Sequence, residues 1–358
     1  MIKFSTVNME NQQELQQLDP QNMLAHIDTL PDQLLNAWDL GQTLPLPDFG
    51  TVKNIIVAGM GGSAIGGDLL SAYMRPLADI PVFSHRDYGL PAWARGRETL
   101  VICSSHSGNT EETLSSFNKA LENGCSVLTL STGGKLSEIA QKVGAPAWRF
   151  NHQGQPRTAV GFSFGILLAL VSRLGMIETT QAEILETVNA MKAQQEKIGF
   201  SIALHANPAR RLAGQLVGRY VSIMAAGENE VVARRWKTQI AELAKAWAQF
   251  EALPEVDHNS LAGLQNPEEA VTKVATVFLR SKYDHPRNQL RLDFTKQQCM
   301  LAGMPVDEVH ASGNSRLAQM WTLLHFGDYV SYYLALHYQV DPTPIEALVA
   351  LKQFLAGH

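Results

Sequence analysis

The segment that decides the fold class of this 358-residue chain is Thr99-Leu100-Val101-Ile102-Cys103-Ser104-Ser105-His106-Ser107-Gly108-Asn109-Thr110-Glu111-Glu112-Thr113. Its first four residues are an apolar run typical of a buried strand, and small hydroxyl and amide residues end that run abruptly. Two glutamates then open a predicted helix. Hydroxyl groups at the strand end and free N–H groups at the helix start together suit an anion, most of all a phosphate. The predicted hydroxyl donors are Ser105, Ser107 and Thr110.

A simpler interpretation of this segment is a polar turn in which Asn109 or Thr110 caps the helix. That interpretation accounts for one or two of the residues. It does not account for several serines that arrive together at a strand end, so phosphate binding is favoured.

The composition excludes several classes of protein. The net charge is −5 and the chain has no run of basic residues, which argues against nucleic acid or an anionic membrane as the main partner. The three cysteines show no CxxC spacing, so we expect neither a disulfide framework nor a zinc site. The expected location is the reducing cytoplasm. The N-terminal residues do not resemble a signal peptide, and the longest apolar stretch, 160–171, is too short to span a bilayer. We therefore expect that stretch to be a buried helix.

Only 18% of the residues are charged, below the share of roughly 25% that is usual in soluble proteins. Much of the surface is therefore expected to be covered by other elements or by another subunit.

Short apolar runs alternate with helical patterns along the chain, which predicts doubly wound parallel sheets of the α/β class. In the first half, apolar runs at 54–58, 99–104 and 126–130 precede helical patterns near 64–74, 110–123 and 135–143. In the second half, apolar runs at 220–226, 274–279 and 306–309 alternate with helical patterns at 229–247, 285–302 and 313–338. The predicted division is a helical lead-in (1–40), two α/β domains (41–200 and 201–340) and a C-terminal helix (341–358).

A glycine-rich loop, Gly59-Met60-Gly61-Gly62-Ser63-Ala64-Ile65-Gly66-Gly67-Asp68, follows the first apolar run. It partly satisfies the dinucleotide-binding fingerprint, which also needs an acidic residue at the end of the next strand, where Asp87 is roughly placed. A loop that binds a sugar or a phosphate is favoured, and a structural tight turn is the third interpretation. Gly61 and Gly62 would let the backbone approach a ligand closely.

A third feature is the helical segment Arg234-Arg235-Trp236-Lys237-Thr238-Gln239-Ile240-Ala241-Glu242-Leu243-Ala244-Lys245. It is followed by a polar loop, 254–260, that holds His258. A carboxylate and an imidazole can divide the roles of general base and ring opener if the fold brings them to one site. The alternative is a solvated charged helix in which Glu242 merely pairs with Lys245.

Five motifs resemble the bifunctional phosphoglucose/phosphomannose isomerase family, whose members are built from two sugar isomerase (SIS) domains. They are GMGGSAIGGD (59–68), SHSGNTEET (105–113), RRWKTQIAELAK (234–245), VDHNS (256–260) and LVALK (348–352). The resemblance extends from about residue 54 to 352. The SIS loops alone would indicate a phosphosugar binder, whereas the combination indicates this isomerase branch.

The resemblance implies a role for each matching residue. It implies that Ser63, Ser105, Ser107 and Thr110 hold the sugar phosphate, and the loop residues Gly61 and Gly62 are expected to bind the substrate beside them. Glu242 would move a proton between C1 and C2, and Arg157 would stabilise the enediolate. His258, from the partner subunit of a dimer, and Lys352 would open the sugar ring. The alternatives place Arg157 at a helix start facing solvent and Lys352 on the surface of the last helix.

The resemblance thus implies an aldose–ketose isomerase that interconverts glucose 6-phosphate, and also mannose 6-phosphate, with fructose 6-phosphate through a cis-enediol. No metal or other cofactor is expected, and the expected assembly is a homodimer with a shared active site. The alternatives are a non-catalytic SIS protein that binds a phosphosugar and regulates another process, or an isomerase for another sugar phosphate. The chain departs from the family pattern at three places. The loop of the second domain carries Glu228, and Glu242 is flanked by Ala241 and Leu243, without the carboxamide that often precedes the base. Asp257 stands where family members more often carry Asn.

Overall fold

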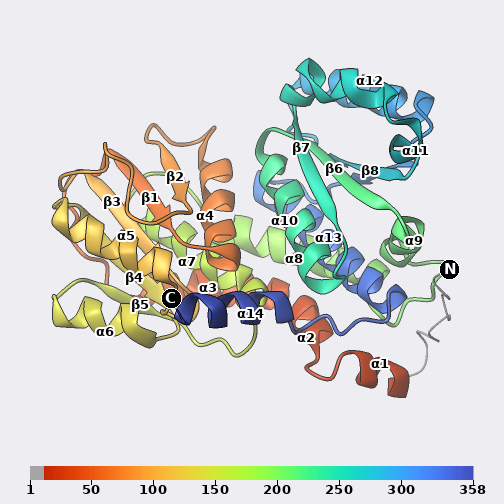
Figure 1. The fold of residues 1–358 in the computed structure, drawn as a ribbon. Helices are drawn as coiled ribbons and strands as arrows, with labels where there is room; N and C mark the ends of the chain where they lie inside the picture. Colours follow the sequence, from red (N-terminus) through yellow and green to blue (C-terminus); the bar gives the residue numbers. More distant parts are fainter. Residues whose placement is uncertain (1–11, 358) are drawn as a thin grey trace. The chain divides into compact units, whose positions relative to one another are not determined.

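The computed structural model describes residues 12–357, and it divides into two compact units (Figure 1). The amino-terminal unit contains residues 29–192 and 313–319, and the carboxy-terminal unit contains the remaining described residues. Residues 1–11 of the predicted lead-in lie outside the described part. The domain boundaries predicted from the sequence remain a proposal.

The amino-terminal unit contains a parallel sheet of five strands in the order β2-β1-β3-β4-β5. The strands are β1 (Asn54–Ala58), β2 (Val82–His85), β3 (Thr99–Ser104), β4 (Ser126–Ser131) and β5 (Ala147–Arg149). In the register, Ala58 pairs with Cys103, so β1 and β3 end side by side. The strand order reverses direction between β1 and β3. Sheets of this kind bind ligands at that reversal, beyond the carboxyl ends of the strands.

Helices cover both faces of this sheet (Figure 1). They are α3 (Leu30–Thr43), α4 (Gly61–Met74), α5 (Glu111–Glu122), α6 (Gly134–Lys142) and α7 (Val160–Arg173). On one face α5 and α6 enclose a core with Val101 and Phe117. The other face carries α4, against which α7 and then α3 pack. Eleven residues of α7 are buried, which confirms the predicted buried helix.

The carboxy-terminal unit contains a second parallel sheet, in the order β7-β6-β8-β9. Its strands are β6 (Tyr220–Ala226), β7 (Ala248–Leu253), β8 (Val274–Arg280) and β9 (Val306–His310). Its helices are α9 (Pro208–Leu216), α10 (Glu230–Leu243), α11 (Glu268–Val271), α12 (Pro286–Leu301) and most of α13 (Arg316–His337). Beneath α12, a core that includes Phe278 and Leu292 fills one face of the sheet. The expectation of two parallel-sheet α/β domains with flanking helices is confirmed.

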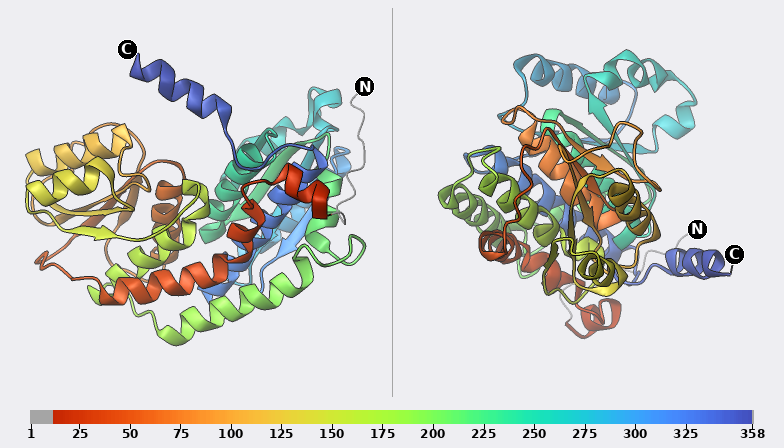
Figure 2. Two further views of the ribbon diagram at one scale, coloured as in Figure 1. Left: turned by 90° about the horizontal axis from the view of Figure 1, so that it is seen from below. Right: turned by 90° about the vertical axis from the view of Figure 1, so that its left-hand side faces the viewer.

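Outside these two sets lie α1 (Gln12–Leu18), α2 (Met23–Asp28) and α8 (Gln181–Ile198). Side chains of α13 hold the two short helices: Tyr332 donates to the Asp19 carboxylate at 3.1 Å, and His325 Nε2 lies 2.8 Å from the carbonyl oxygen of Ile27. The last helix, α14 (Glu346–Ala356), projects from its own unit in both views of Figure 2. No helix within residues 12–357 is long and apolar enough to cross a membrane.

The structure corrects three details of the sequence-based expectations. The helix expected over 229–247 ends at Leu243, because Lys245 takes a positive φ of 54° and β7 begins at Ala248. The strands β2, β5 and β7 were not predicted. The polar loop at 254–260 contains a short 3₁₀ helix, η3 (Glu255–His258).

Candidate active site

The serine-rich loop after β3 is organised around Ser105, whose side chain is buried. Ser105 Oγ lies 2.9 Å from Thr110 Oγ1, and it also accepts the Gly108 N–H at 3.1 Å. Ser107 Oγ is exposed and accepts the Asn109 N–H at 3.2 Å. The loop therefore gathers three hydroxyl groups beside the start of α5.

The simpler interpretation, a helix cap, fits this geometry poorly. Thr110 is the N-cap residue of α5, but its side chain contacts Ser105 instead of an amide of the first turn. The Asn109 side chain accepts the Lys135 N–H at 3.1 Å. The first N–H groups of a helix have no acceptor within the helix, so the start of α5 offers donors to an anion.

Glycine is required at the centre of this loop. Gly108 has a φ of 69°, and a Cβ atom there would lie 1.8 Å from the carbonyl oxygen of Gly133. The Gly108 carbonyl in turn accepts the Leu136 N–H at 2.8 Å. The loops after β3 and β4 are therefore packed backbone to backbone.

The glycine-rich loop after β1 lies against both the serine-rich loop and the segment that contains Arg157. Ser63 is buried, and its Oγ accepts the His106 N–H at 3.1 Å. A Cβ atom on Gly62 would lie 2.4 Å from the carbonyl oxygen of Pro156. Arg157 is only 3% exposed, so the solvent-facing alternative for this residue is wrong.

The amino-terminal unit thus brings together seven of the ten predicted site residues. These are Gly61, Gly62, Ser63, Ser105, Ser107, Thr110 and Arg157. They lie at the carboxyl ends of β1 and β3 and on the turn before α7, at the reversal of the strand order.

The other three predicted residues belong to the carboxy-terminal unit, on three different elements. Glu242 is half-buried near the end of α10, and the Lys245 ammonium donates to its main-chain oxygen at 2.5 Å. His258 is the exposed last residue of η3, and Lys352 is exposed on α14.

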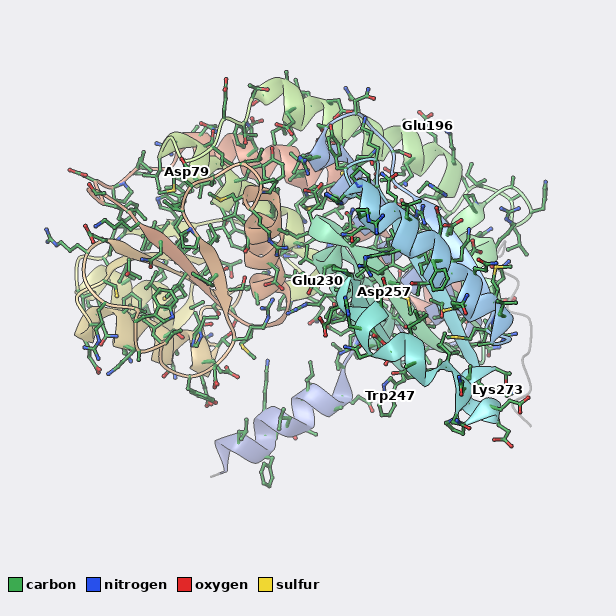
Figure 3. All side chains as sticks on the ribbon, turned by 90° about the horizontal axis from the view of Figure 1, so that it is seen from above. Asp79, Glu196, Glu230, Trp247, Asp257 and Lys273 are labelled. Carbon is green, nitrogen blue, oxygen red and sulfur yellow. The ribbon has the colours of Figure 1, made fainter. Side chains whose placement is uncertain are left out.

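The segment that carries His258 is fixed to α12 by its neighbour Asp257, labelled in Figure 3. The Asp257 carboxylate accepts from Arg291 at 2.9 Å and from Thr295 at 2.7 Å. The aspartate at position 257, where family members more often carry Asn, therefore anchors this segment. The sequence alone did not reveal it, because both partners lie more than thirty residues away.

A buried ion pair fixes α10, the helix that carries Glu242. Arg235 donates to the two carboxylate oxygens of Asp328 on α13 at 3.1 and 2.8 Å, and both side chains are almost fully buried. The neighbouring Trp236 donates to the Leu323 carbonyl at 2.9 Å. Gly327 is needed beside them, since a Cβ atom there would lie 2.2 Å from the indole nitrogen.

A groove of about 750 Å³ lies between α10 and the start of α14. Its lining includes Lys237, Ala241 and Lys245 from one side and Pro344 and Glu346 from the other. The lining also includes Trp247, which is 78% exposed and is labelled in Figure 3.

Two histidines beside the serine-rich loop were not predicted as site residues. His106 Nε2 lies 2.9 Å from His152 Nδ1, and burial lowers the pKa of His106. For His106, its position inside the predicted phosphate-binding loop could have indicated a role in the site. Its partner, 46 residues away, gave no signal in the sequence.

Within 12–357, no group of three or more His, Cys, Asp or Glu side chains is arranged to hold a metal ion. Asp87, which a dinucleotide site would use, lies two residues beyond β2 and accepts the N–H of its neighbour Tyr88 at 2.8 Å.

Comparison with protein families gives a match over residues 205–355. The matching model describes the bacterial phospho-glucose isomerase C-terminal SIS domain.

Curated relatives match most of the chain. A bifunctional phosphoglucose/phosphomannose isomerase from Caldicellulosiruptor bescii is 39% identical over 336 residues, which are 93% of this chain and 99% of the relative. A protein of the same name from Aquifex aeolicus is 34% identical over 316 residues, 87% of this chain and 93% of the relative.

Among solved structures, a hypothetical protein from Thermus thermophilus superposes with a TM-score of 0.73. The match covers 96% of this chain and 92% of that protein at 15% sequence identity, so it supports the fold alone.

Proposed function

Because the chain belongs to the bifunctional phosphoglucose/phosphomannose isomerase family, we propose that it interconverts glucose 6-phosphate and fructose 6-phosphate. The enzyme is an isomerase, an intramolecular oxidoreductase. The observation that carries the substrate proposal is the cluster of Ser63, Ser105 and Thr110 hydroxyls at the reversal of the strand order. Mannose 6-phosphate, the C2 epimer of glucose 6-phosphate, is the proposed second substrate.

The phosphate group is proposed to bind at the serine-rich loop and the start of α5. The neutral hydroxyl donors and the helix dipole favour a dianion there without a lysine. Binding at this remote group then contributes orientation at C1 and C2, where the reaction takes place.

Glu242 is the proposed base. Its carboxylate removes the proton from C2 of the open-chain aldose and later returns that proton to C1, while the hydroxyl proton moves from O2 to O1. The intermediate is a cis-enediol, and the Arg157 guanidinium is proposed to stabilise the negative charge that develops on its oxygens.

His258 and Lys352 are proposed to open the sugar ring by proton transfer at O1 and the ring oxygen. Both side chains are exposed, so they are accessible to a substrate or to a second subunit. The Asp257 contacts with α12 hold the His258 segment in one conformation, which a proton donor needs.

A homodimer in which His258 acts in the partner's site is the proposed assembly, and the cytoplasm is the proposed location. Beside the His258 segment, Leu290 and Phe294 are 60% and 53% exposed, and with Leu261 they line a groove of about 350 Å³. An exposed apolar patch of this kind suits a subunit contact. The cysteine thiols are free, as a reducing compartment requires.

The test of the proposed base is Glu242→Gln, which keeps the shape of the side chain and removes the carboxylate. We expect kcat for glucose 6-phosphate to fall by about 10²–10⁴-fold, because the general base is lost. The Kd for fructose 6-phosphate, measured by calorimetry, is expected to stay within about threefold, since neutral hydroxyls hold the phosphate.

Full activity of this variant would refute the role of Glu242. Assaying glucose 6-phosphate, mannose 6-phosphate and glucosamine 6-phosphate side by side with the wild-type protein separates the proposed substrates from another sugar phosphate. Thermal stabilisation by fructose 6-phosphate without any conversion would instead indicate a binding protein.

A further inference from the structure

A chain of hydrogen bonds leads from the serine-rich loop to the turn that contains Arg157. His106 Nε2 lies 2.9 Å from His152 Nδ1, and His152 Nε2 lies 3.3 Å from Thr158 Oγ1. Thr158 Oγ1 in turn donates to the Gln155 carbonyl at 2.8 Å. Thr158 directly follows Arg157, so the chain ends on the short helix η1 (Pro156–Thr158).

The direction of each bond follows from the last one. The Thr158 hydroxyl gives its proton to Gln155, so it accepts from His152, which must carry its proton on Nε2. The Nδ1 atom of a neutral His152 is then an acceptor, and His106 must donate from Nε2. Both neutral rings are therefore Nε2–H tautomers, and all three bonds run the same way.

At each end of this hydrogen-bond chain, neighbouring side chains hold the main-chain groups of the terminal residue. At the loop end, the His106 N–H donates to Ser63 Oγ, and the His106 carbonyl accepts from Thr132 Oγ1 at 2.7 Å. At the other end, the Thr158 carbonyl accepts from Gln33 at 2.9 Å.

Aromatic rings enclose the histidine pair. The Phe150 and Phe162 rings stack with centroids 5.1 Å apart, and the His106 ring stands edge-on to Phe150 at 6.0 Å. Packing restricts the rotamers of the two histidines, and the hydrogen bonds fix their tautomers. The pair therefore holds the serine-rich loop and η1 at one separation.

We propose that His106 and His152 are positioning residues that set the Arg157 turn against the serine-rich loop. The proposal rests on the proposed function, in which the loop holds the sugar phosphate and Arg157 stabilises the enediolate. Loss of the pair then misplaces Arg157 at the moment when charge develops, while the hydroxyl groups still hold the phosphate. The pair is thus expected to affect kcat and to leave KM nearly unchanged.

The test compares His106→Phe with His106→Gln. Phenylalanine keeps a ring against Phe150 but has no donor, whereas the glutamine amide nitrogen reaches the position of Nε2. We expect kcat to fall about tenfold or more in His106→Phe with KM within about twofold, and His106→Gln to recover most of the loss. Equal activity of the two variants, at equal thermal unfolding midpoints, would overturn the proposal.

A double-mutant cycle with Arg157→Ala tests whether the pair acts through Arg157. If it does, His106→Phe added to Arg157→Ala causes no further loss of kcat. If the fold-losses of kcat in the two single variants multiply in the double variant, the histidines do not act through Arg157.

The nitrogen chemical shifts of ¹⁵N-labelled histidine test the bonding independently of activity. The proposal predicts Nε2–H tautomers for both residues, assigned with single His→Asn variants, and an Nδ1–H tautomer at either would overturn it. If the wild-type enzyme converts no sugar phosphate, the proposed function fails while the tautomers still report on the hydrogen-bond chain.

Discussion

Ser105 and Thr110 show how two neutral side chains prepare a site for an anion. Ser105 Oγ accepts the Gly108 N–H and lies within hydrogen-bond distance of Thr110 Oγ1. Each hydroxyl has one proton, so when the buried Ser105 donates to Thr110, the proton of the half-buried Thr110 remains for a ligand. The loop can therefore offer a donor to a phosphate oxygen without breaking its own contacts.

His325 makes stability depend on pH. Burial lowers its pKa from 6.5 to about 4, while its Nε2 is 2.8 Å from the Ile27 carbonyl. Between about pH 6.5 and pH 4, the unfolded chain binds a proton at His325 that the folded chain does not. Stability is therefore lost as the pH falls through this range. The expected loss from pH 7 to pH 4.5 is about 2–3 kcal/mol.

His325→Gln keeps a donor for Ile27 and removes this titration. Urea unfolding at pH 7 and pH 4.5 is expected to show a smaller loss of stability on acidification in the variant than in the wild type, by about 2–3 kcal/mol. An identical loss in both proteins would contradict the assignment.

The strand-end hydroxyls could be predicted from the sequence, because their places follow from the end of one apolar run. The burial of Arg157 and the contact of His106 with His152 could not. A lone arginine or histidine in a loop gives no indication of a partner contributed by another loop.

At the scale of helices, α10 is held to α13 by the buried pair of Arg235 and Asp328. Asp328→Asn leaves a buried guanidinium without its counter-charge. We expect it to lower the free energy of unfolding by about 3–5 kcal/mol, measured by urea denaturation.

Glu122→Gln is the matched control, because it breaks the exposed pair with Lys119. Its expected cost is no more than about 1 kcal/mol. A loss for Asp328→Asn as small as that of the control would show that the pair does not stabilise α10.

The strands that escaped prediction are all edge strands. Those strands are β2 and β5 of the first sheet and β7 of the second. Each mixes buried and partly exposed positions; Phe83 of β2, for example, is 47% exposed. Neighbouring strands and helices cover a central parallel strand on every side, so the central strands carry continuous apolar runs and were predicted. Among the described edge strands β9 alone was predicted, because valines stand at positions 306 and 309.

At the scale of the whole chain, the two sheets share one strand order. Each has its first strand flanked by its second and third, in the orders β2-β1-β3 and β7-β6-β8. Duplication of one ancestral domain would produce this shared order. Within residues 12–357, the serine-rich loop follows β3 of the first sheet, and the proposed sugar phosphate binds there.

The proposed dimer predicts complementation between two inactive variants. If His258 serves the partner's Glu242, a heterodimer of Glu242→Gln and His258→Asn chains has one intact site. Mixing the two variants after mild unfolding and refolding is expected to restore about a quarter of the wild-type activity, since half of the random dimers carry one site of two. Light scattering checks that the mixture has twice the chain mass of 39.3 kDa. Activity no higher than that of the separate variants would place both residues in one chain's site or exclude the dimer.

In the proposed complex, Glu242 faces C1 and C2 of a sugar whose phosphate is bound by Ser105 and Thr110. A crystal structure with 5-phosphoarabinonate, whose carboxylate mimics the enediolate, measures this directly. We predict the phosphate at the serine-rich loop and a Glu242 carboxylate oxygen about 3–3.5 Å from the carbon that represents C1 or C2. A Glu242 carboxylate remote from the bound analogue in every copy of the assembly would show that Glu242 is not the base.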